Sequence, residues 1–417
     1  MKRENGDYFD IKKQGFCFGD MDYKKLIASL KTGIALELER ELCLGKKLSI
    51  SRLQKLRIEY SDLPINELLD HYKLQQRARR KFSHANEMVF TASGVEQSSS
   101  EIMGKYHNRR AGKASSLADL CCGIGGDLQY LAENRQKVYA VDLDSDSLLC
   151  AKYNCQFYNN ISYLQEKAEN YGEKVELIFC DPDRRPQGNR KYNVEDMSPD
   201  LGQVLDLFFE KKLCGGMLIK LSPVINYLKV EKEYFSNWSK YATQWYSWEF
   251  ISEDGVLKEI LLCVGSHAER IKRKAVILPA GVELTGSGTE QVETKGWQSY
   301  IFEPDKAIIR AGLVQKLGAE LGYQLLDGHL ALLTGEHAVS EEYGRLFKFI
   351  EVMPYNIKKM QKYLREHEVG ELILKTRGFP DPVEKIHKKF KLKGNKKMIM
   401  LIVRLGKGHQ VAVLEKG

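Results

Sequence analysis

The sequence predicts an α/β protein with a mainly parallel sheet in its middle, a helical segment before it and a small α/β domain after it. Three observations lead to this prediction. Short apolar runs alternate with helical patterns between about 115 and 266, and strands separated by helices form parallel sheets with right-handed crossovers. The first apolar run ends in a glycine-rich turn. A charged stretch at 266–274 then separates the middle of the chain from a lysine-rich tail.

Residues 1–110 are predicted to form a helical N-terminal region. Apolar residues recur at roughly helical spacing from Leu26 onward, and residues 65–81 form a second amphipathic run. The basic end of this run suits a helix C-terminus, because that end of a helix carries partial negative charge. No ligand is needed to explain it.

Residues 111–270 are predicted to form the central domain. Its expected strands are residues 117–122, 137–142, 175–180 and 216–221. Helical patterns at 127–134 and 145–159 separate the first three strands. Residues 250–263 hold two apolar runs around a Gly-containing turn, which predicts a hairpin at the end of the sheet.

The rest of the chain is predicted to form two small units. Residues 271–335 are expected to make an α/β connecting unit of ferredoxin-like type, and residues 336–417 a basic domain. From Arg345 to Gly417 there are 18 Lys and Arg against 7 Asp and Glu, a balance of 18 − 7 = +11. Because the whole chain carries +8, the remainder carries 8 − 11 = −3. A confined basic surface is typical of a polyanion partner, although charge alone is explained as well by a solvated lysine-rich face.

Composition excludes several classes of protein. No apolar run reaches the roughly 18 residues that a membrane span needs, and the first residues are polar. The 9 cysteines are odd in number and form no Cys-x-x-Cys pair, so neither a disulfide framework nor a metal site is expected. These features predict a cytoplasmic protein without membrane association.

The strongest functional signal is the turn Asp119-Leu-Cys-Cys-Gly-Ile-Gly-Gly-Asp127, at an expected strand-to-helix junction. Glycine permits backbone angles and close ligand approach that a Cβ would prevent, and the following helix offers free N–H groups. A dinucleotide fingerprint would need a third glycine where Leu128 stands, and a Walker loop is absent too. The turn therefore favours S-adenosylmethionine over a nucleotide phosphate.

Two acids strengthen this interpretation. Asp119 suits the ammonium group of the methionine moiety, and Asp142, which ends the next expected strand, can accept both ribose hydroxyls. A glycine-rich turn that binds nothing is the alternative. The predicted cofactor-binding residues are Gln97, Ser98, Asp119, Cys122, Gly123, Gly125, Gly126, Asp127, Asp142, Leu143 and Asp181.

Gln97 and Ser98 are included because they precede the first expected strand, where such a segment can fold over the methionine end of the cofactor. Ser98 followed by Glu101 is equally well explained as a capping box at the start of a helix. The sequence does not decide between the two interpretations.

Asp181-Pro182-Asp183-Arg184 follows the strand that begins near Val175. Because ligands bind at the carboxyl ends of parallel strands, Asp181 is expected to face the same crevice as the glycine-rich turn. All four residues are predicted to be catalytic. Asp181 can orient an acceptor amine and receive its proton, Asp183 can help to position the acceptor, and Arg184 can grip a phosphate. A solvated Asp-Pro turn is the alternative.

Residues 119–127 with Val141-Asp142 resemble the cofactor motifs of class I methyltransferases, especially the trimethylguanosine synthase group, which acts on RNA guanine amines. With residues 181–185, 300–312 and 375–380, nearly the whole chain is similar to bacterial methyltransferases that carry a C-terminal THUMP-like domain. The resemblance implies a Rossmann-like class I methyltransferase sheet, S-adenosylmethionine as cofactor and RNA as partner. The Asp-Pro-Asp-Arg form departs from the Asp/Asn-Pro-Pro-aromatic pattern of amine methyltransferases, which leaves the acceptor atom open.

The expected function is therefore S-adenosylmethionine-dependent methylation of structured RNA, either tRNA or rRNA. Two alternatives stay open. One is a methyltransferase that acts on a small molecule or a protein, and the other is a non-catalytic RNA-binding protein that keeps the methyltransferase fold. The sequence gives no indication of the oligomeric state.

Overall fold

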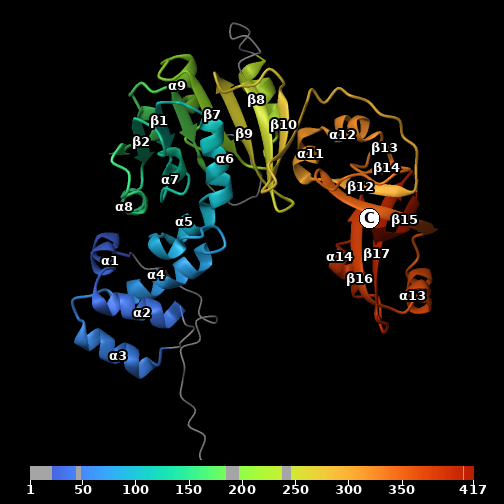
Figure 1. The fold of residues 1–417 in the computed structure, drawn as a ribbon, viewed down its shortest axis with the longest axis horizontal. Coiled ribbons are helices and arrows are strands. Elements are labelled where there is room, and N and C mark those ends of the chain that lie inside the picture. Colours follow the sequence, from blue (N-terminus) through green and yellow to red (C-terminus); the bar gives the residue numbers. More distant parts are fainter. Residues whose placement is uncertain (1–20, 44–47, 185–196, 237–245, 407) are drawn as a thin grey trace, which may run out of the picture. The chain divides into compact units, whose positions relative to one another are not determined.

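The computed structural model describes residues 21–43, 48–184, 197–236, 246–406 and 408–417. The chain forms two compact units. Unit 1 comprises residues 1–245 and 263–268, and unit 2 comprises residues 246–262 and 269–417. Figure 1 shows the order of the elements along the chain. No helix in the described part of the chain is both long and apolar enough to cross a membrane.

The N-terminal region is helical, as the sequence predicts. Its helices are α1 (Tyr23–Ser29), α2 (Gly33–Cys43), α3 (Ile50–Glu59), α4 (Ile65–Ala78), η1 (Ala85–Glu87), α5 (Ala92–Gln97) and α6 (Glu101–Ala111). Asp22 caps α1 by accepting a hydrogen bond from the Lys25 N–H, and Ser49 caps α3 in the same way. Their apolar faces share one core, in which Leu26 and Leu68 are fully buried.

Five parallel strands of unit 1 carry the site described below. They are β1 (Ser116–Leu120), β2 (Lys137–Asp142), β3 (Ile161–Gln165), β4 (Leu177–Cys180) and β7 (Gly216–Leu221). Their order is β7-β4-β1-β2-β3, so the chain reverses direction across the sheet between β1 and β4. Ligands bind at such a reversal, outside the carboxyl ends of the strands.

Helices and short turns connect these strands. They are α7 (Leu128–Leu131), α8 (Ser145–Asn154), η2 (Ala168–Asn170), α9 (Leu201–Phe209), α10 (Tyr227–Val230) and η4 (Glu231–Phe235), with the short strand pair β5 (Asp183–Arg184) and β6 (Met197–Ser198). Helix α7 is shorter than the expected run of 127–134. The chain leaves helical conformation soon after it, because Asn134 has a φ of +58°.

The sheet continues beyond the expected domain boundary at residue 270. Strands β8 (Tyr246–Glu253) and β9 (Val256–Gly265) flank the turn Asp254–Gly255, where both residues have positive φ. Strand β10 (Arg273–Leu278) pairs in parallel with β8, and β11 (Val282–Gly286) pairs with β10. The complete order is β11-β10-β8-β9-β7-β4-β1-β2-β3. The charged stretch at 266–274, interpreted as a separator, therefore runs into a strand of this sheet.

Unit 2 also contains a second, mostly antiparallel sheet. In order across the sheet its strands are β13 (Gln324–Leu325), β14 (Leu333–Gly335), β12 (Tyr300–Pro304), β15 (Gly344–Pro354), β18 (Gly408–Lys416), β17 (Lys396–Leu405) and β16 (Val369–Arg377). Only the pairing of β16 with β17 is parallel. Its helices are α11 (Lys306–Ala311), α12 (Val314–Leu321), α13 (Ile357–Glu366) and α14 (Val383–His387).

Candidate active site

The glycine-rich turn leaves β1 directly and is built from unusual backbone angles. Cys121, Gly123 and Gly125 have φ of +66°, +53° and +82°. A Cβ on Gly126 would lie 2.9 Å from the Cβ of Ser98, so the turn packs tightly against the segment before α6. At Gly123, by contrast, a Cβ would meet nothing within 4 Å. The turn is thus closed on one side and open beside Gly123.

Asp142, the last residue of β2, is tied to this turn. Its Oδ2 accepts a hydrogen bond of 2.7 Å from the Gly123 N–H, and its Oδ1 accepts one of 2.9 Å from the Asp144 N–H. Burial raises the pKa of Asp142, while these backbone hydrogen bonds oppose the rise. Leu143 follows with 60% of its surface exposed, so an apolar side chain lies free next to the carboxylate.

Asp119 lies near the end of β1 and is 1% exposed. Its Oδ2 is buried without a hydrogen-bond partner, which is rare for a carboxylate. Burial, and then the nearby carboxylates of Asp127 and Asp181, raise the pKa of Asp119 well above its usual range. A cation placed against Oδ2 would remove both penalties.

A second buried oxygen without a hydrogen-bond partner is the Oγ of Ser98. The capping-box interpretation of Ser98 is wrong, because helix α6 is capped by Ser100, whose hydroxyl accepts from the Met103 N–H at 3.2 Å. Ser98 instead follows α5, whose last residue, Gln97, is exposed. The Ser98 side chain is therefore spared from helix capping and lies against Gly126 of the turn.

A buried network of charged and polar side chains surrounds Asp127. Its Oδ1 contacts the Nδ1 of His107 at 2.7 Å, and its Oδ2 accepts from the Ser99 Oγ at 2.8 Å and from the Lys220 Nζ at 3.2 Å. Burial alone would raise the pKa of Asp127, but the Lys220 ammonium and His107 lower it below its usual value. Both carboxylate oxygens of Asp127 are thus engaged within the protein.

Lys220 links this network to the predicted catalytic segment. Its Nζ contacts the Oδ2 of Asp181 as well as Asp127, and the Lys220 side chain is only 8% exposed. Asp181 directly follows β4, and its N–H donates to the Leu120 carbonyl at the end of β1. Its side chain keeps 35% of its surface exposed. Asp181 is therefore both held by a cation and open to a reactant.

The other predicted residues are placed as follows. Pro182 and Cys122 are buried, and burial raises the pKa of the Cys122 thiol. Asp183 and Arg184 form β5, but their side chains lie outside the described part of the structure. Within the described residues, no group of three or more His, Cys, Asp or Glu side chains is arranged to hold a metal ion.

Sequence reasoning missed Lys220, His107 and Ser99. Lys220 lies in the apolar strand Gly216-Met-Leu-Ile-Lys-Leu, and a lysine inside such a buried strand is itself a signal, because lysine is almost never buried without a partner. His107, fully buried on α6, gives a weaker signal of the same kind.

The described residues fit S-adenosylmethionine. The unpartnered Asp119 oxygen can accept an ammonium group, and the turn is open beside Gly123. Asp142 offers a carboxylate at the end of β2, with exposed Leu143 beside it for an apolar ring face. These groups lie at the carboxyl ends of β1 and β2, next to Asp181.

Comparisons with known proteins match two parts of the chain to family models. Residues 114–222 match the family model described as RNA cap guanine-N2 methyltransferase, and residues 344–416 match the one described as THUMP domain-like. The chain is 24% identical over 356 residues to a protein named an uncharacterized S-adenosylmethionine-dependent methyltransferase in two strains of Mycobacterium tuberculosis, covering 82% of this chain and 93% of that protein.

A solved structure shares the fold as well. The crystal structure of a protein from Porphyromonas gingivalis W83, described as a putative methyltransferase, superposes with a TM-score of 0.69 and 19% identity, over 84% of this chain and 89% of that one. The predicted class I fold with a helical N-terminal segment and a C-terminal sheet domain is confirmed. The chain is therefore an S-adenosylmethionine-dependent methyltransferase homologue that carries a THUMP-like domain after its class I methyltransferase domain.

Proposed function

We propose that this protein transfers the methyl group of S-adenosylmethionine to a base of structured RNA, either tRNA or rRNA. The observation that carries the proposal is the half-open carboxylate of Asp181, held by buried Lys220 next to the glycine-rich turn. It puts a hydrogen-bond acceptor for the substrate beside the groups that fit the methyl donor.

In this proposal the predicted residues divide the work of binding the donor. Asp119 receives the ammonium group, Ser98 and Gln97 cover the same end, and Asp142 holds the ribose. The main chain from Cys122 to Gly126 lines the donor, and Leu143 covers its adenine. When bound, the cofactor supplies a methyl group on a positively charged sulfur. Asp127 supports this site indirectly by holding His107, Ser99 and Lys220 in place, because both of its carboxylate oxygens contact these protein groups.

Asp181 acts on the acceptor in this proposal. Its exposed surface lets the carboxylate accept a hydrogen bond from an exocyclic base amine, aim the amine nitrogen and receive its proton. Lys220 keeps the carboxylate in place and compensates its charge in a largely buried environment. Pro182 fixes the main chain after Asp181, while Asp183 and Arg184 are proposed to position the acceptor and its phosphate.

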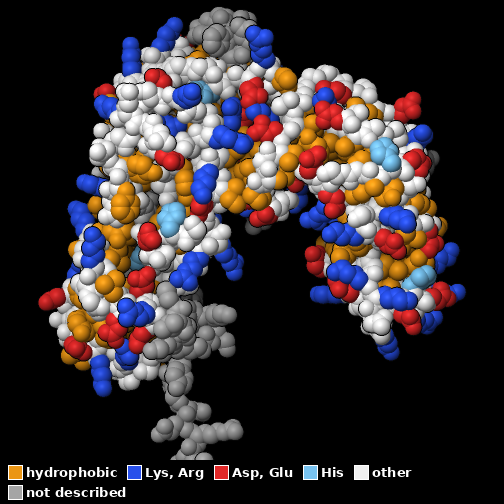
Figure 2. Space-filling view, viewed as in Figure 1, with side chains coloured by type: hydrophobic (Ala, Val, Ile, Leu, Met, Phe, Trp, Pro, Cys, Tyr) orange, Lys and Arg blue, Asp and Glu red, His pale blue; other side chains and the backbone are white. Residues whose placement is uncertain are grey.

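Three features support RNA as the acceptor. The methyltransferase domain matches a family described by RNA cap guanine-N2 methylation, and the C-terminal domain matches a THUMP-like model. The C-terminal region also carries the basic excess of the chain. Figure 2 shows Lys and Arg side chains on the visible face of this region, with acidic side chains between them. After α14 the exposed side chains of Lys388, Lys389, Lys391 and Lys393 form no ion pair with any described residue. We call these four residues the lysine loop.

The lysine loop is held in place by its main chain. Gln361 on α13 donates to the Lys391 carbonyl at 3.0 Å and accepts from the Lys391 N–H at 2.7 Å. Four exposed ammonium groups on one loop are suited to phosphate oxygens. We further propose a cytoplasmic location. The seven cysteines whose side chains the structure describes are free thiols, as is usual in reducing compartments.

The decisive experiment compares RNA from cells with and without the gene. Mass spectrometry of nucleosides should reveal one methylated nucleoside that is missing without the gene, and the purified protein should restore it with labelled donor. Asp181→Ala should abolish this transfer while the protein still binds S-adenosylhomocysteine. Identical nucleosides in both RNA samples would contradict the proposal.

A further inference from the structure

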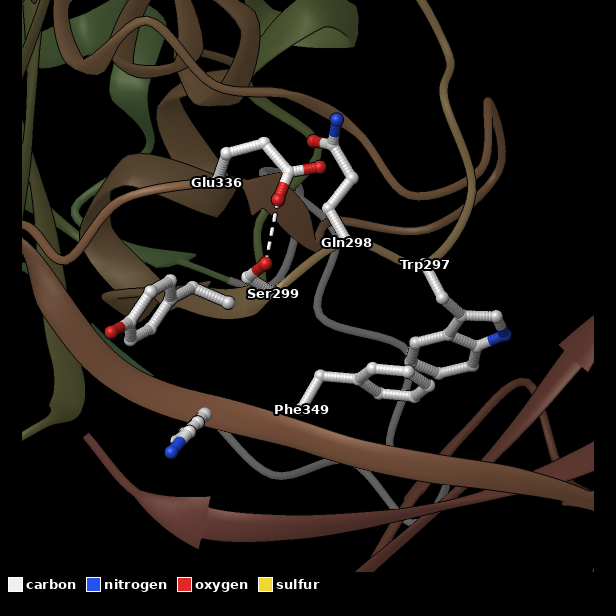
Figure 3. Close-up of a pocket in the computed structure, with 7 residues that line it drawn as sticks. Trp297, Gln298, Ser299, Glu336 and Phe349 are labelled. Atoms are coloured by element: carbon white, nitrogen blue, oxygen red, sulfur yellow. Dashed lines mark hydrogen bonds between the residues drawn. The ribbon is translucent and has the colours of Figure 1, made fainter.

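Unit 2 contains a pocket of about 510 Å³ that the proposed chemistry does not use (Figure 3). Trp297 and Phe349 form its apolar side, and Gln298, Ser299 and Glu336 form a polar side. These residues come from the segment before β12, from the position just after β14 and from the middle of β15.

The aromatic side is pre-arranged. The Trp297 and Phe349 rings stack with centroids 5.2 Å apart and planes 14° from parallel. The indole Nε1–H donates to Gln410 Oε1 at 2.8 Å, and the Phe349 N–H donates to the Ser299 carbonyl at 2.9 Å. Both rings are nevertheless only partly buried. An ordered, half-exposed aromatic pair is a suitable surface on which a flat ring can stack.

The polar side presents hydrogen-bond acceptors. Ser299 Oγ donates to Glu336 Oε2 at 2.6 Å and thereby orients the carboxylate, whose other oxygen has no partner among the described residues. The Oε1 of Gln298 is buried and has no hydrogen-bond partner. Because a buried acceptor without a donor is costly, this oxygen suits a ligand that brings N–H groups. Exposed Lys348 also lines the pocket and adds a positive charge.

We infer that this pocket binds an unpaired nucleobase that carries an exocyclic amine. The base stacks on the Trp297–Phe349 pair, its amine donates to Glu336 and Gln298, and Lys348 contacts the adjoining phosphate. The inference rests on the proposed function, because the nucleobase belongs to the RNA substrate. It adds a second point of RNA recognition that is separate from the methyl-transfer site. Uracil, which has a carbonyl oxygen in place of the amine, is disfavoured by the carboxylate.

The test measures binding of fluorescently labelled hexamers of A, C and U to the full chain at low salt. We expect the A and C hexamers to bind about tenfold more tightly than the U hexamer. Phe349→Ala should weaken binding of the A and C hexamers about tenfold, since a stacking surface is lost. Phe349→Leu, which keeps an apolar side chain in place, should weaken binding similarly, and an unchanged thermal midpoint of this variant shows that the loss is not due to unfolding.

Glu336→Gln is the sharper variant, because a glutamine can donate to the uracil carbonyl. It should remove most of the preference for C over U, whereas Glu342→Gln, an exposed acid that does not line the pocket, should leave the preference intact. Free CMP that binds as tightly as the C hexamer would overturn the assignment to RNA.

The outcomes separate the two proposals. If the wild-type chain binds structured RNA but the Phe349 and Glu336 variants bind all hexamers like wild type, the pocket inference fails and the proposed function stands. If the wild-type chain binds neither structured RNA nor any hexamer, both fail.

Discussion

One carboxylate oxygen of Asp119 is buried without a hydrogen-bond partner, and this lowers the stability of the ligand-free protein. Its pKa is raised by burial and by two neighbouring carboxylates, so the folded state favours the protonated form at a pH where the unfolded chain is ionised. A group of this kind destabilises the folded state at neutral pH, and the cost shrinks as the pH falls through the raised pKa. Such a cost is expected where a cation binds.

Asp119→Asn should therefore have opposite effects on stability and binding. It should raise the thermal midpoint of the ligand-free protein at pH 7, because no charge is buried. It should also weaken binding of S-adenosylhomocysteine at least about tenfold, since a charge-assisted hydrogen bond is lost. Calorimetry at several pH values checks this. The wild-type affinity should fall as the pH is lowered and Asp119 is protonated, and the variant should lack this dependence.

Lys220 bridges the carboxylates of Asp127 and Asp181. Lys220→Met should lower the free energy of unfolding by about 3 kcal/mol, because Asp127 is left buried beside another carboxylate with less compensation. It should also abolish methyl transfer. Denaturant unfolding measures the first effect, with Lys174→Met, at an exposed position before β4, as the matched control. An equal loss in both variants would contradict the role given to Lys220.

At the scale of elements, the sequence reveals the acids of the site better than its lysine. Asp119, Asp142 and Asp181 each lie at or next to the carboxyl end of a short apolar strand, and parallel strands bring such ends together. That rule alone places all three near one crevice. Lys220 lies within a strand, so only the three-dimensional pairing of β7 with β4 reveals its contact with Asp181. The Trp297–Phe349 pocket joins distant segments and leaves no local pattern.

Helix α4 carries a buried histidine that makes the N-terminal helices sensitive to acid. Burial lowers the pKa of His71 to about 4, and neither ring nitrogen has a hydrogen-bond partner. In the unfolded chain the histidine binds its proton with its ordinary pKa of 6.5. The stability due to neutral His71 is therefore complete above that pH and is lost as the pH falls toward 4.

We expect this to cost about 3 kcal/mol of unfolding free energy between pH 7 and 4. His71→Leu, which keeps an apolar group in the same core, should remove that share of the pH dependence. Denaturant unfolding of both proteins at pH 7, 5.5 and 4.5 measures the difference. Parallel stability curves for the two proteins would show that His71 does not contribute.

For the whole molecule, the uneven charge predicts how RNA binding depends on salt. Each phosphate contact releases counterions, so the logarithm of the affinity should fall linearly with the logarithm of salt concentration. Replacing the four residues of the lysine loop by alanine should reduce the slope by about 3. The control changes four exposed lysines of the N-terminal helical region, Lys24, Lys25, Lys31 and Lys55. If the control changes the slope as much as the loop variant, net charge and not the loop governs binding.

The domain boundaries of the molecule are harder to predict from the sequence than its motifs. The charged stretch at 266–274 has the composition of a linker, yet Arg273 and Lys274 begin β10. Lys274 is accommodated there by ion pairs with Glu249, Glu269 and Glu283. A strand whose charges are neutralised by residues distant in sequence cannot be distinguished from a linker by composition.

The glycine-rich turn and the N-terminal helices share one interior. Ile124, in the middle of the turn, belongs to the same apolar core as Leu26 and Phe90, together with Cys150 from α8. A trimmed version of the protein that starts at residue 111 would retain the glycine-rich turn and the Asp181 segment, but it would lose Ser98 and His107. It would also lack the apolar residues of the N-terminal helices against which Ile124 of the turn packs. The smallest fragment worth expressing therefore includes the helices from α1 onward.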